Sequence, residues 1–119
     1  ILKCISQYPA NIKNLNLSSL KYLKKLFNCT VGYSDHTIGI TAPIVAVSLG
    51  AKIIEKHITL NSKKKGFDHK ISLEFKDFML MVKKIRDAEE MMGSKKFILP
   101  KDLDNTRKLF RRYLFTKKK

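Results

Sequence analysis

The most constraining feature of the sequence is the stretch from Val31 to Thr59, in which two apolar segments flank a third. The outer segments, VGYSDHT and AKIIEKHIT, are short and carry His36 and His57 near their ends. The middle segment, TAPIVAVSLG, is apolar and stops at Gly50, a residue typical of helix C-termini. This pattern predicts a strand, a helix and a second strand. Parallel strands joined in this way are apolar along most of their length, as these are.

The same alternation continues on both sides of that stretch. The leucines between residues 17 and 27 recur at helical spacing, with Asn16 as the expected N-cap and Asn28 as the expected stop. The predicted elements are, in order, a strand over 1–6, a helix over 17–27, a strand over 30–34, a helix over 41–49, a strand over 52–58 and a helix over 75–92. A last short helix is expected from Asp104 or Asn105 to about Leu114, before a disordered lysine tail.

The helix over 75–92 is expected to be amphipathic, ended by Gly93. Its predicted buried stripe consists of Phe75, Phe78, Met79, Val82, Ile85 and Ala88. The four methionines at 79, 81, 91 and 92 are predicted to be core packing. Cys4 and Cys29 form no CxxC spacing, so two buried thiols are expected rather than a disulfide or a zinc site.

Repeated βα building predicts an α/β protein with parallel strands. Three such units fit either a small doubly wound sheet or the last three units of a TIM (β/α)₈ barrel. In both folds the functional residues lie at the carboxyl ends of the strands. Side chains two residues apart share a face of a strand, so Ser34 and His36 should face the same way, as should Glu55 and His57. Lys56 should lie on the helix side with Ile54, near the strand end, from which its amine can extend to the rim.

Charge and targeting patterns narrow the class of protein. The formal net charge of +15 fits either nucleic-acid binding or a lysine-rich solvated surface. The lysines are scattered, and no aromatic interleaving or helix-turn-helix pattern accompanies them, which favours the solvated surface. The sequence shows neither a signal peptide nor an apolar run that could span a bilayer, so we expect a cytoplasmic protein without a membrane partner.

Four runs together carry a resemblance to a known family. The runs are CISQYPA, VGYSDHTIGI, AVSLGAKIIEKHITL and GFDHKISLE, and the match of which they are part extends in order across nearly the whole chain, up to about Leu114. They resemble the N-acetylneuraminate (sialic acid) synthase family, which includes pseudaminic and legionaminic acid synthases and spore-coat polysaccharide synthases. The resemblance implies that the chain is a C-terminal fragment, about three βα units, of a TIM barrel.

The resemblance also implies a reaction. Phosphoenolpyruvate would condense with an N-acetylated amino sugar, such as N-acetylmannosamine, to give a nonulosonic acid and phosphate. A divalent metal, manganese or alternatively magnesium, would polarise the sugar aldehyde. By position, the residues implied are His36 and His57 for the metal, Ser6 and Ser34 for phosphoenolpyruvate, and Tyr8 and Asp68 for the sugar. Glu55, on the face of His57, is the candidate catalytic carboxylate that orients a metal-bound water or hydroxyl.

Each of these residues also has a structural interpretation. A single histidine is more often a satisfied structural residue than a ligand, and a strand-end serine is often only a cap. Tyr8 can pack against its loop, and Asp68 beside Gly66 can be a turn residue. His69 is predicted to be a hydrogen-bonding loop residue rather than a ligand.

A strand that begins at the first residue, with no lead-in, indicates a piece of a longer protein. Residues 1–103 would form the last barrel units. Residues 104–119 would be a short helix and basic tail leading to an antifreeze-like domain that the family places there. The full-length family is expected to form homodimers. The alternatives are an inactive or split-gene barrel subunit and a small basic nucleic-acid-binding protein.

Overall fold

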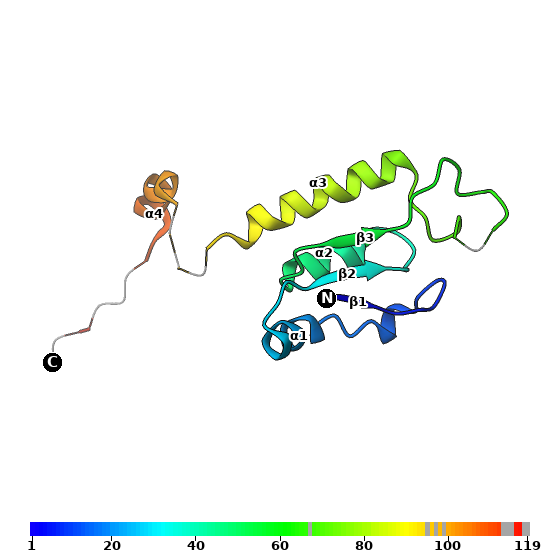
Figure 1. Cartoon of the computed structure of the whole chain (residues 1–119). Coiled ribbons are helices and arrows are strands. Elements are labelled where there is room, and N and C mark those ends of the chain that lie inside the picture. Colours follow the sequence, from blue (N-terminus) through cyan, green and yellow to red (C-terminus); the bar gives the residue numbers. More distant parts are fainter. Residues whose placement is uncertain (67, 95, 97, 99, 113–115, 118–119) are drawn as a thin grey trace.

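The computed structural model describes residues 1–66, 68–94, 96, 98, 100–112 and 116–117 (Figure 1). Within these residues the sheet has the parallel strand order β1-β2-β3. The strands are β1 (Leu2–Cys4), β2 (Gly32–Asp35) and β3 (Ile54–Lys56). The helices are α1 (Ser19–Phe27), α2 (Thr41–Ser48), α3 (Phe75–Met92) and α4 (Asp104–Phe110), with 3₁₀ turns η1 (Ile12–Asn14) and η2 (Lys101–Leu103).

The predicted order of strands and helices is therefore confirmed, with strands shorter than expected. The bounds of α3 agree with the prediction, and Asn28 ends α1 in the left-handed conformation, with φ of 46°. Asn16 is not the N-cap of α1. The helix is preceded by Ser18, and the Asn16 backbone carbonyl accepts a hydrogen bond from the Ser19 hydroxyl at 2.8 Å. The preceding turn η1 had no clear signal in the sequence.

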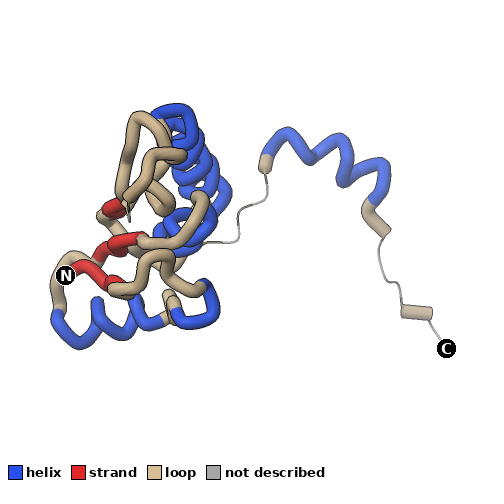
Figure 2. The backbone as a smooth tube through the Cα atoms, turned by 90° about the vertical axis from the view of Figure 1, so that its right-hand side faces the viewer, coloured by secondary structure: helices blue, strands red, loops and turns tan. Residues whose placement is uncertain are grey.

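The register of the sheet brings the strand ends to one edge. Cys4 pairs with Ser34, Ser34 pairs with Glu55, and Asp35 pairs with Lys56. Because all three strands are parallel, the segments that follow them leave from the same, carboxyl edge. Figure 2 shows α2 and α3 lying together on one side of the strands.

The hydrophobic core lies between the sheet and the helices. Tyr33 projects from β2 among Leu20 of α1 and Ala42 and Ala46 of α2, all buried. A second cluster joins Val47 of α2 to Leu73, Met81 and Ile85, with Ile54 of β3 packed against both clusters. The alternate residues of β2 point to the opposite face of the sheet, as period-2 strand geometry requires.

The predicted buried stripe of α3 is wrong in part. Phe75 and Met79 are 74% and 51% exposed, whereas Met81 and Ile85 are buried. Neighbouring faces of α3 carry similar numbers of apolar residues. Which face contacts α2 therefore depends on tertiary packing and not on the sequence of the helix. Met91 and Met92 are also exposed, so the methionines other than Met81 are not core residues.

The buried-thiol prediction is wrong as well. Cys4 is exposed and Cys29 is half-buried, and both are free. Cys4 lies on β1, an edge strand of the described sheet, so no strand covers its outer side.

Beyond α3 the chain leaves the sheet. Helix α4 ends at Phe110 and packs with η2, apart from the strands (Figure 1). The predicted helix end at Leu114 and most of the lysine tail fall outside the described residues. None of the helices in the described part of the chain has both the length and the apolar character required to cross a membrane.

Candidate functional site

The two predicted histidines lie beside each other at the carboxyl edge of the sheet. His36 directly follows β2 and His57 directly follows β3. The centroids of their imidazole rings are 5.3 Å apart, and the ring planes are inclined by 59°. His36 is buried and His57 is half-buried. The structure thus brings together two nitrogen donors that are well separated in the sequence.

The ring of His36 is oriented by the neighbouring strand. Its Nδ1 lies 2.9 Å from the Ile5 carbonyl oxygen. Since a carbonyl only accepts, this bond requires the proton on Nδ1, and in the neutral imidazole the lone pair is then on Nε2. Cys4 Sγ also lies 3.7 Å from Nδ1, a contact that the sequence did not indicate. The His36 backbone carbonyl accepts from the Ala10 amide at 2.9 Å, which fixes the main chain at this point.

Ser34 and Glu55 are joined just before the histidines. The Ser34 hydroxyl donates to Glu55 Oε1 at 2.6 Å, across two residues that are in register. Ser34 is buried, and Glu55 is exposed. Ser34 and Glu55 therefore lie on one face of the sheet, and their side chains are hydrogen-bonded to each other.

Tyr8 covers the histidine pair. Its ring stacks on His36, with centroids 4.2 Å apart and planes inclined by 28°. The same ring meets His57 edge-on at 6.0 Å. Tyr8 is still 47% exposed, so one side of the ring faces outward. A tyrosine that only packed against its own loop would not show these contacts.

Ser6 and Asp68 are not gathered into this cluster. Ser6 is exposed and follows Ile5, so it lies at the same edge. Asp68 is exposed in the loop between β3 and α3. That loop is anchored near the histidines, because the Leu73 amide donates to the His57 carbonyl at 2.9 Å. His69 has the predicted loop role, with Nδ1 2.8 Å from the Thr59 hydroxyl.

The opposite face of the same strands holds an ion pair that the sequence analysis missed. Lys56 Nζ lies 2.8 Å from Asp35 Oδ2, and both side chains have 0% exposure. The prediction that the Lys56 amine reaches the rim is wrong, since a buried carboxylate lies within its reach. A signal was present, because Asp35 and Lys56 hold equivalent positions, one residue before each histidine.

Tyr33 completes this buried group. Its hydroxyl donates to Asp35 Oδ1 at 3.0 Å. Burial raises the pKa of Tyr33 well above its ordinary value, and the nearby Asp35 carboxylate adds to the rise. Tyr33 is therefore held as a neutral hydrogen-bond donor.

The histidine pair fits a shared divalent cation. With metal–nitrogen bonds of about 2.1 Å and an angle near 100°, two imidazole centroids around one ion lie roughly 5 Å apart. A metal ligand also needs a free lone pair on its nitrogen, and the neutral His36 ring has one on Nε2. Among the described residues no group of three or more His, Cys, Asp or Glu side chains could hold a metal. Within the described part of the chain, His36 and His57 alone would hold such an ion, and its remaining positions would be left to water or substrate oxygens.

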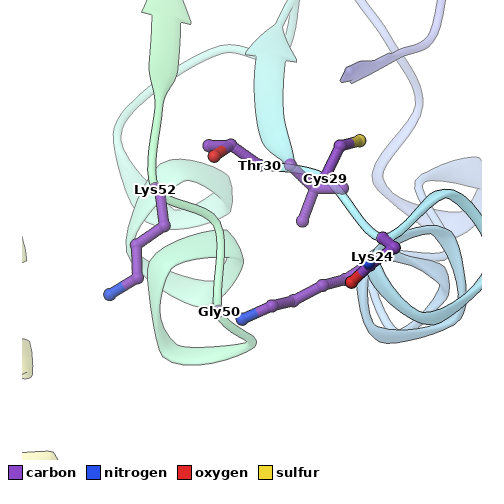
Figure 3. A pocket seen from close by; sticks show the side chains of 7 residues that line it. Lys24, Cys29, Thr30, Gly50 and Lys52 are labelled. Carbon is purple, nitrogen blue, oxygen red and sulfur yellow. The ribbon is translucent and has the colours of Figure 1, made fainter.

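A separate hollow of about 380 Å³ lies at the other edge of the sheet, where β2 and β3 begin. Figure 3 shows Lys24 extending toward Gly50, with Lys52 pointing away. Helices α1 and α2 both end here, and the partial negative charge of helix C-termini favours lysine amines. The lysines are thus explained without a ligand.

Together, the described residues define an α/β protein whose polar side chains gather at the carboxyl edge of parallel strands. Comparison with known proteins agrees with this class. A family model described as the NeuB family matches residues 1–97. The chain therefore belongs to the NeuB family, as its motifs had indicated.

Individual relatives show the extent of the likeness. The chain is 49% identical over 105 residues to an uncharacterised protein of Methanocaldococcus jannaschii, covering 87% of this chain and 31% of that one. It is 44% identical over 118 residues to a pseudaminic acid synthase of Campylobacter jejuni, covering 98% and 34%. The crystal structure of the N-acetylneuraminic acid (sialic acid) synthetase of Leptospira borgpetersenii matches with a TM-score of 0.78 and 36% identity, covering 94% and 40%. The chain thus spans about a third of the length of the curated relatives it matches.

Proposed function

We propose that this chain carries the metal-binding edge of a phosphoenolpyruvate-dependent synthase, a transferase that makes a nonulosonic acid. In this reaction the methylene carbon of phosphoenolpyruvate bonds to the aldehyde carbon of an N-acetylated amino sugar. Water then adds to the resulting cation, and phosphate leaves by C–O cleavage. The observation that carries the proposal is the 5.3 Å separation of the His36 and His57 rings at adjacent strand ends in a NeuB-family chain.

The histidines would hold a divalent cation, manganese or magnesium, through His36 Nε2 and a ring nitrogen of His57. When bound, the cation supplies Lewis-acid polarisation of the sugar aldehyde. The contact from His36 Nδ1 to the Ile5 carbonyl supports this role, because it fixes the tautomer and the direction of the donor nitrogen. Tyr8 restrains the same ring by stacking on one of its faces.

Ser34 and Ser6 would donate hydrogen bonds to phosphoenolpyruvate. The Ser34 hydroxyl now donates to Glu55, so binding of the anion at Ser34 requires that this bond be exchanged. The exchange would free the Glu55 carboxylate to orient a water or hydroxyl at the metal. Glu55 is exposed and lies two residues before His57, on the same face of the strand, so it can take up this role.

Tyr8 and Asp68 would contact the sugar. One face of the Tyr8 ring lies against the histidine pair and its other side is exposed, so the ring borders the place where the aldehyde would be polarised. Asp68 belongs to a loop anchored at the His57 carbonyl through Leu73, so the loop can bring a carboxylate to the edge of the site.

The three strands would be the last three of an eight-stranded barrel, within residues 1–103. Residues 104–119 would lead to the antifreeze-like domain, and the full-length enzyme would be a homodimer. Two features support this placement. The polar strand face opposite the helices would become the barrel interior. The apolar residues beyond β3, Ile58 and Leu60, are exposed here and would be covered by the first strand of the closed barrel.

A chimera tests the proposal. This chain would replace the corresponding part of the Leptospira sialic acid synthetase, and phosphate release would be measured with phosphoenolpyruvate, N-acetylmannosamine and Mn²⁺. We expect His36→Ala and His57→Ala to lower phosphate release by at least about 100-fold, because the electrophilic assistance is worth several kcal/mol.

Lys24→Ala is the matched control, since Lys24 lies at the opposite edge of the sheet. It should leave phosphate release unchanged. If both histidine variants retain the full rate of phosphate release, the assignment of the histidines fails. If the unsubstituted chimera binds Mn²⁺ but releases no phosphate, the alternative of an inactive barrel subunit is favoured.

A further inference from the structure

The histidine pair is held by cross-links on both faces of the same two strands. On one face the Ser34 hydroxyl bonds to Glu55 at 2.6 Å. On the other face Lys56 forms its fully buried ion pair with Asp35 at 2.8 Å. Both pairs are in register, and they occupy the two positions immediately before the histidines. The ends of β2 and β3 are thereby fixed relative to each other.

The ion pair also holds the main chain on the far side of His36. Asp35 Oδ1 accepts from the Thr37 amide at 2.9 Å. The Lys56 amine donates a further, short hydrogen bond to the Thr37 carbonyl. Asp35 and Thr37 flank His36 in the sequence, so the backbone of His36 is restrained from both directions. The Tyr33 hydroxyl bonds to the same carboxylate oxygen and limits its rotation.

Stability alone does not account for such a pair. The desolvation of two buried charges offsets much of their attraction, and an apolar pair of similar volume is often as stable. An ion pair does, however, fix distance and direction more tightly than apolar packing, because both charges need their hydrogen bonds satisfied. Here the satisfied bonds all converge on the residues around His36.

We propose that Asp35 and Lys56 are positioning residues that set the spacing of the His36 and His57 rings and thereby the affinity for a divalent cation. They touch neither the cation nor the substrate and act through the strand ends. The effect on cation affinity rests on the proposed function, but the ring spacing can be measured without any metal.

The test uses the 119-residue chain and two measurements. Mn²⁺ affinity is followed by electron paramagnetic resonance, and the ring spacing by nuclear Overhauser effects between the His36 and His57 ring protons. The variant Asp35→Leu/Lys56→Met removes both charges without leaving either one unpaired. We expect it to fold, to lose the ring-to-ring Overhauser effects and to bind Mn²⁺ about 10–100-fold more weakly, the usual cost of losing an outer partner of a ligand.

A matched control is Lys84→Ala/Asp87→Ala, which removes a second ion pair on the exposed surface of α3. It should change neither measurement. If the apolar double variant does not fold, Asp35→Glu takes its place, because it keeps the charge and lengthens the carboxylate arm by one methylene. We expect it to shift the ring-to-ring Overhauser effects and to weaken Mn²⁺ binding several-fold.

A folded double variant, or Asp35→Glu in its place, that keeps wild-type Overhauser effects would overturn the positioning role. Unchanged Mn²⁺ affinity in that variant would do the same. The proposed function fails in a different way. In that case the unsubstituted chain would show no Mn²⁺ affinity, or His36→Ala and His57→Ala would leave the affinity unchanged. The Overhauser effects of the double variant would then still decide whether the ion pair positions the rings.

Discussion

At the residue scale, the tightest position in the sheet is Gly32 in β2. A Cβ atom built there would lie 2.5 Å from the Ile53 backbone oxygen and 2.6 Å from Leu2 Cδ2. The leucine side chain can move, but the Ile53 carbonyl belongs to the strand segment that pairs with β2. Only glycine therefore lets β2 approach both neighbouring strands at this point.

We expect Gly32→Ala to destabilise the chain by about 1–3 kcal/mol, the usual cost of forcing extra volume into a packed site. Equilibrium unfolding in urea measures the change. Thr30→Ala, at an exposed position two residues earlier, should cost much less. Equal losses in the two variants would contradict the close approach at Gly32.

At the element scale, α3 presents one row of side chains to the core and a neighbouring row to solvent. Met81 is 2% exposed and packs with Val47 of α2, whereas Met79 is 51% exposed. The two residues are chemically identical and two positions apart, so they form a matched pair for testing which row is buried.

Met81→Ala should cost about 2–5 kcal/mol, because it leaves a cavity in the second core cluster. Met79→Ala should stay within about 0.5 kcal/mol of the wild type. Thermal unfolding followed by circular dichroism separates the two outcomes. A larger loss of stability for Met79→Ala than for Met81→Ala would instead support the buried face that was expected from the sequence.

The loop between β3 and α3 is closed by Glu74. Its Oε1 accepts from the Ser62 amide at 2.9 Å and from the Ser62 hydroxyl at 2.7 Å. These hydrogen bonds, the backbone one foremost, lower the pKa of Glu74 below its ordinary value of 4.5. The folded state therefore favours the carboxylate, and this contribution to stability is present above pH 4.5 and lost as the pH falls through the lowered pKa.

Glu74→Gln should consequently be less stable than the wild type near neutral pH. The difference between the two proteins should close under acid conditions, where the wild-type carboxyl also becomes neutral. Urea unfolding at a series of pH values measures the gap. A gap that stays constant as the pH falls would show that the charge of Glu74 does not contribute.

At the scale of the whole molecule, an exposed apolar patch and a high net charge have opposite effects on self-association. A hollow of about 380 Å³ beyond β3 is lined by Ile58, Thr59, Leu60, Phe75 and Phe78. Leu60 is 96% exposed and Phe75 is 74% exposed. Such a patch favours association, whereas the net charge of +15 keeps copies apart through repulsion that salt screens.

We therefore expect the 119-residue chain to associate increasingly as the salt concentration rises, as measured by sedimentation velocity. Leu60→Ser/Phe75→Ser should reduce that association. Ile12→Ser is the control, because Ile12 is similarly exposed but lies on η1. Association that falls with salt would point to charge-driven rather than apolar contacts.

The candidate site shows which kinds of residue can be placed from the sequence. His36, His57, Ser34 and Glu55 could be assigned to one edge, because strand alternation and βα order fix the face and the end of each strand. Tyr8 could be assigned only to the following loop, and its stacking on His36 depends on how that loop folds back. Lys56 was misplaced, because the length of a lysine side chain allows either the rim or a buried partner.

The sequence by itself determined the order of elements, the parallel βα class, the family and the edge where the histidines lie, because these follow from local periodicity and motif spacing. Only the tertiary structure decided which row of α3 is buried, where the Lys56 charge goes and how far apart the imidazoles lie. Those features depend on contacts between segments that are distant in the chain. The local sequence pattern is compatible with several arrangements, and the packing of these segments selects one of them.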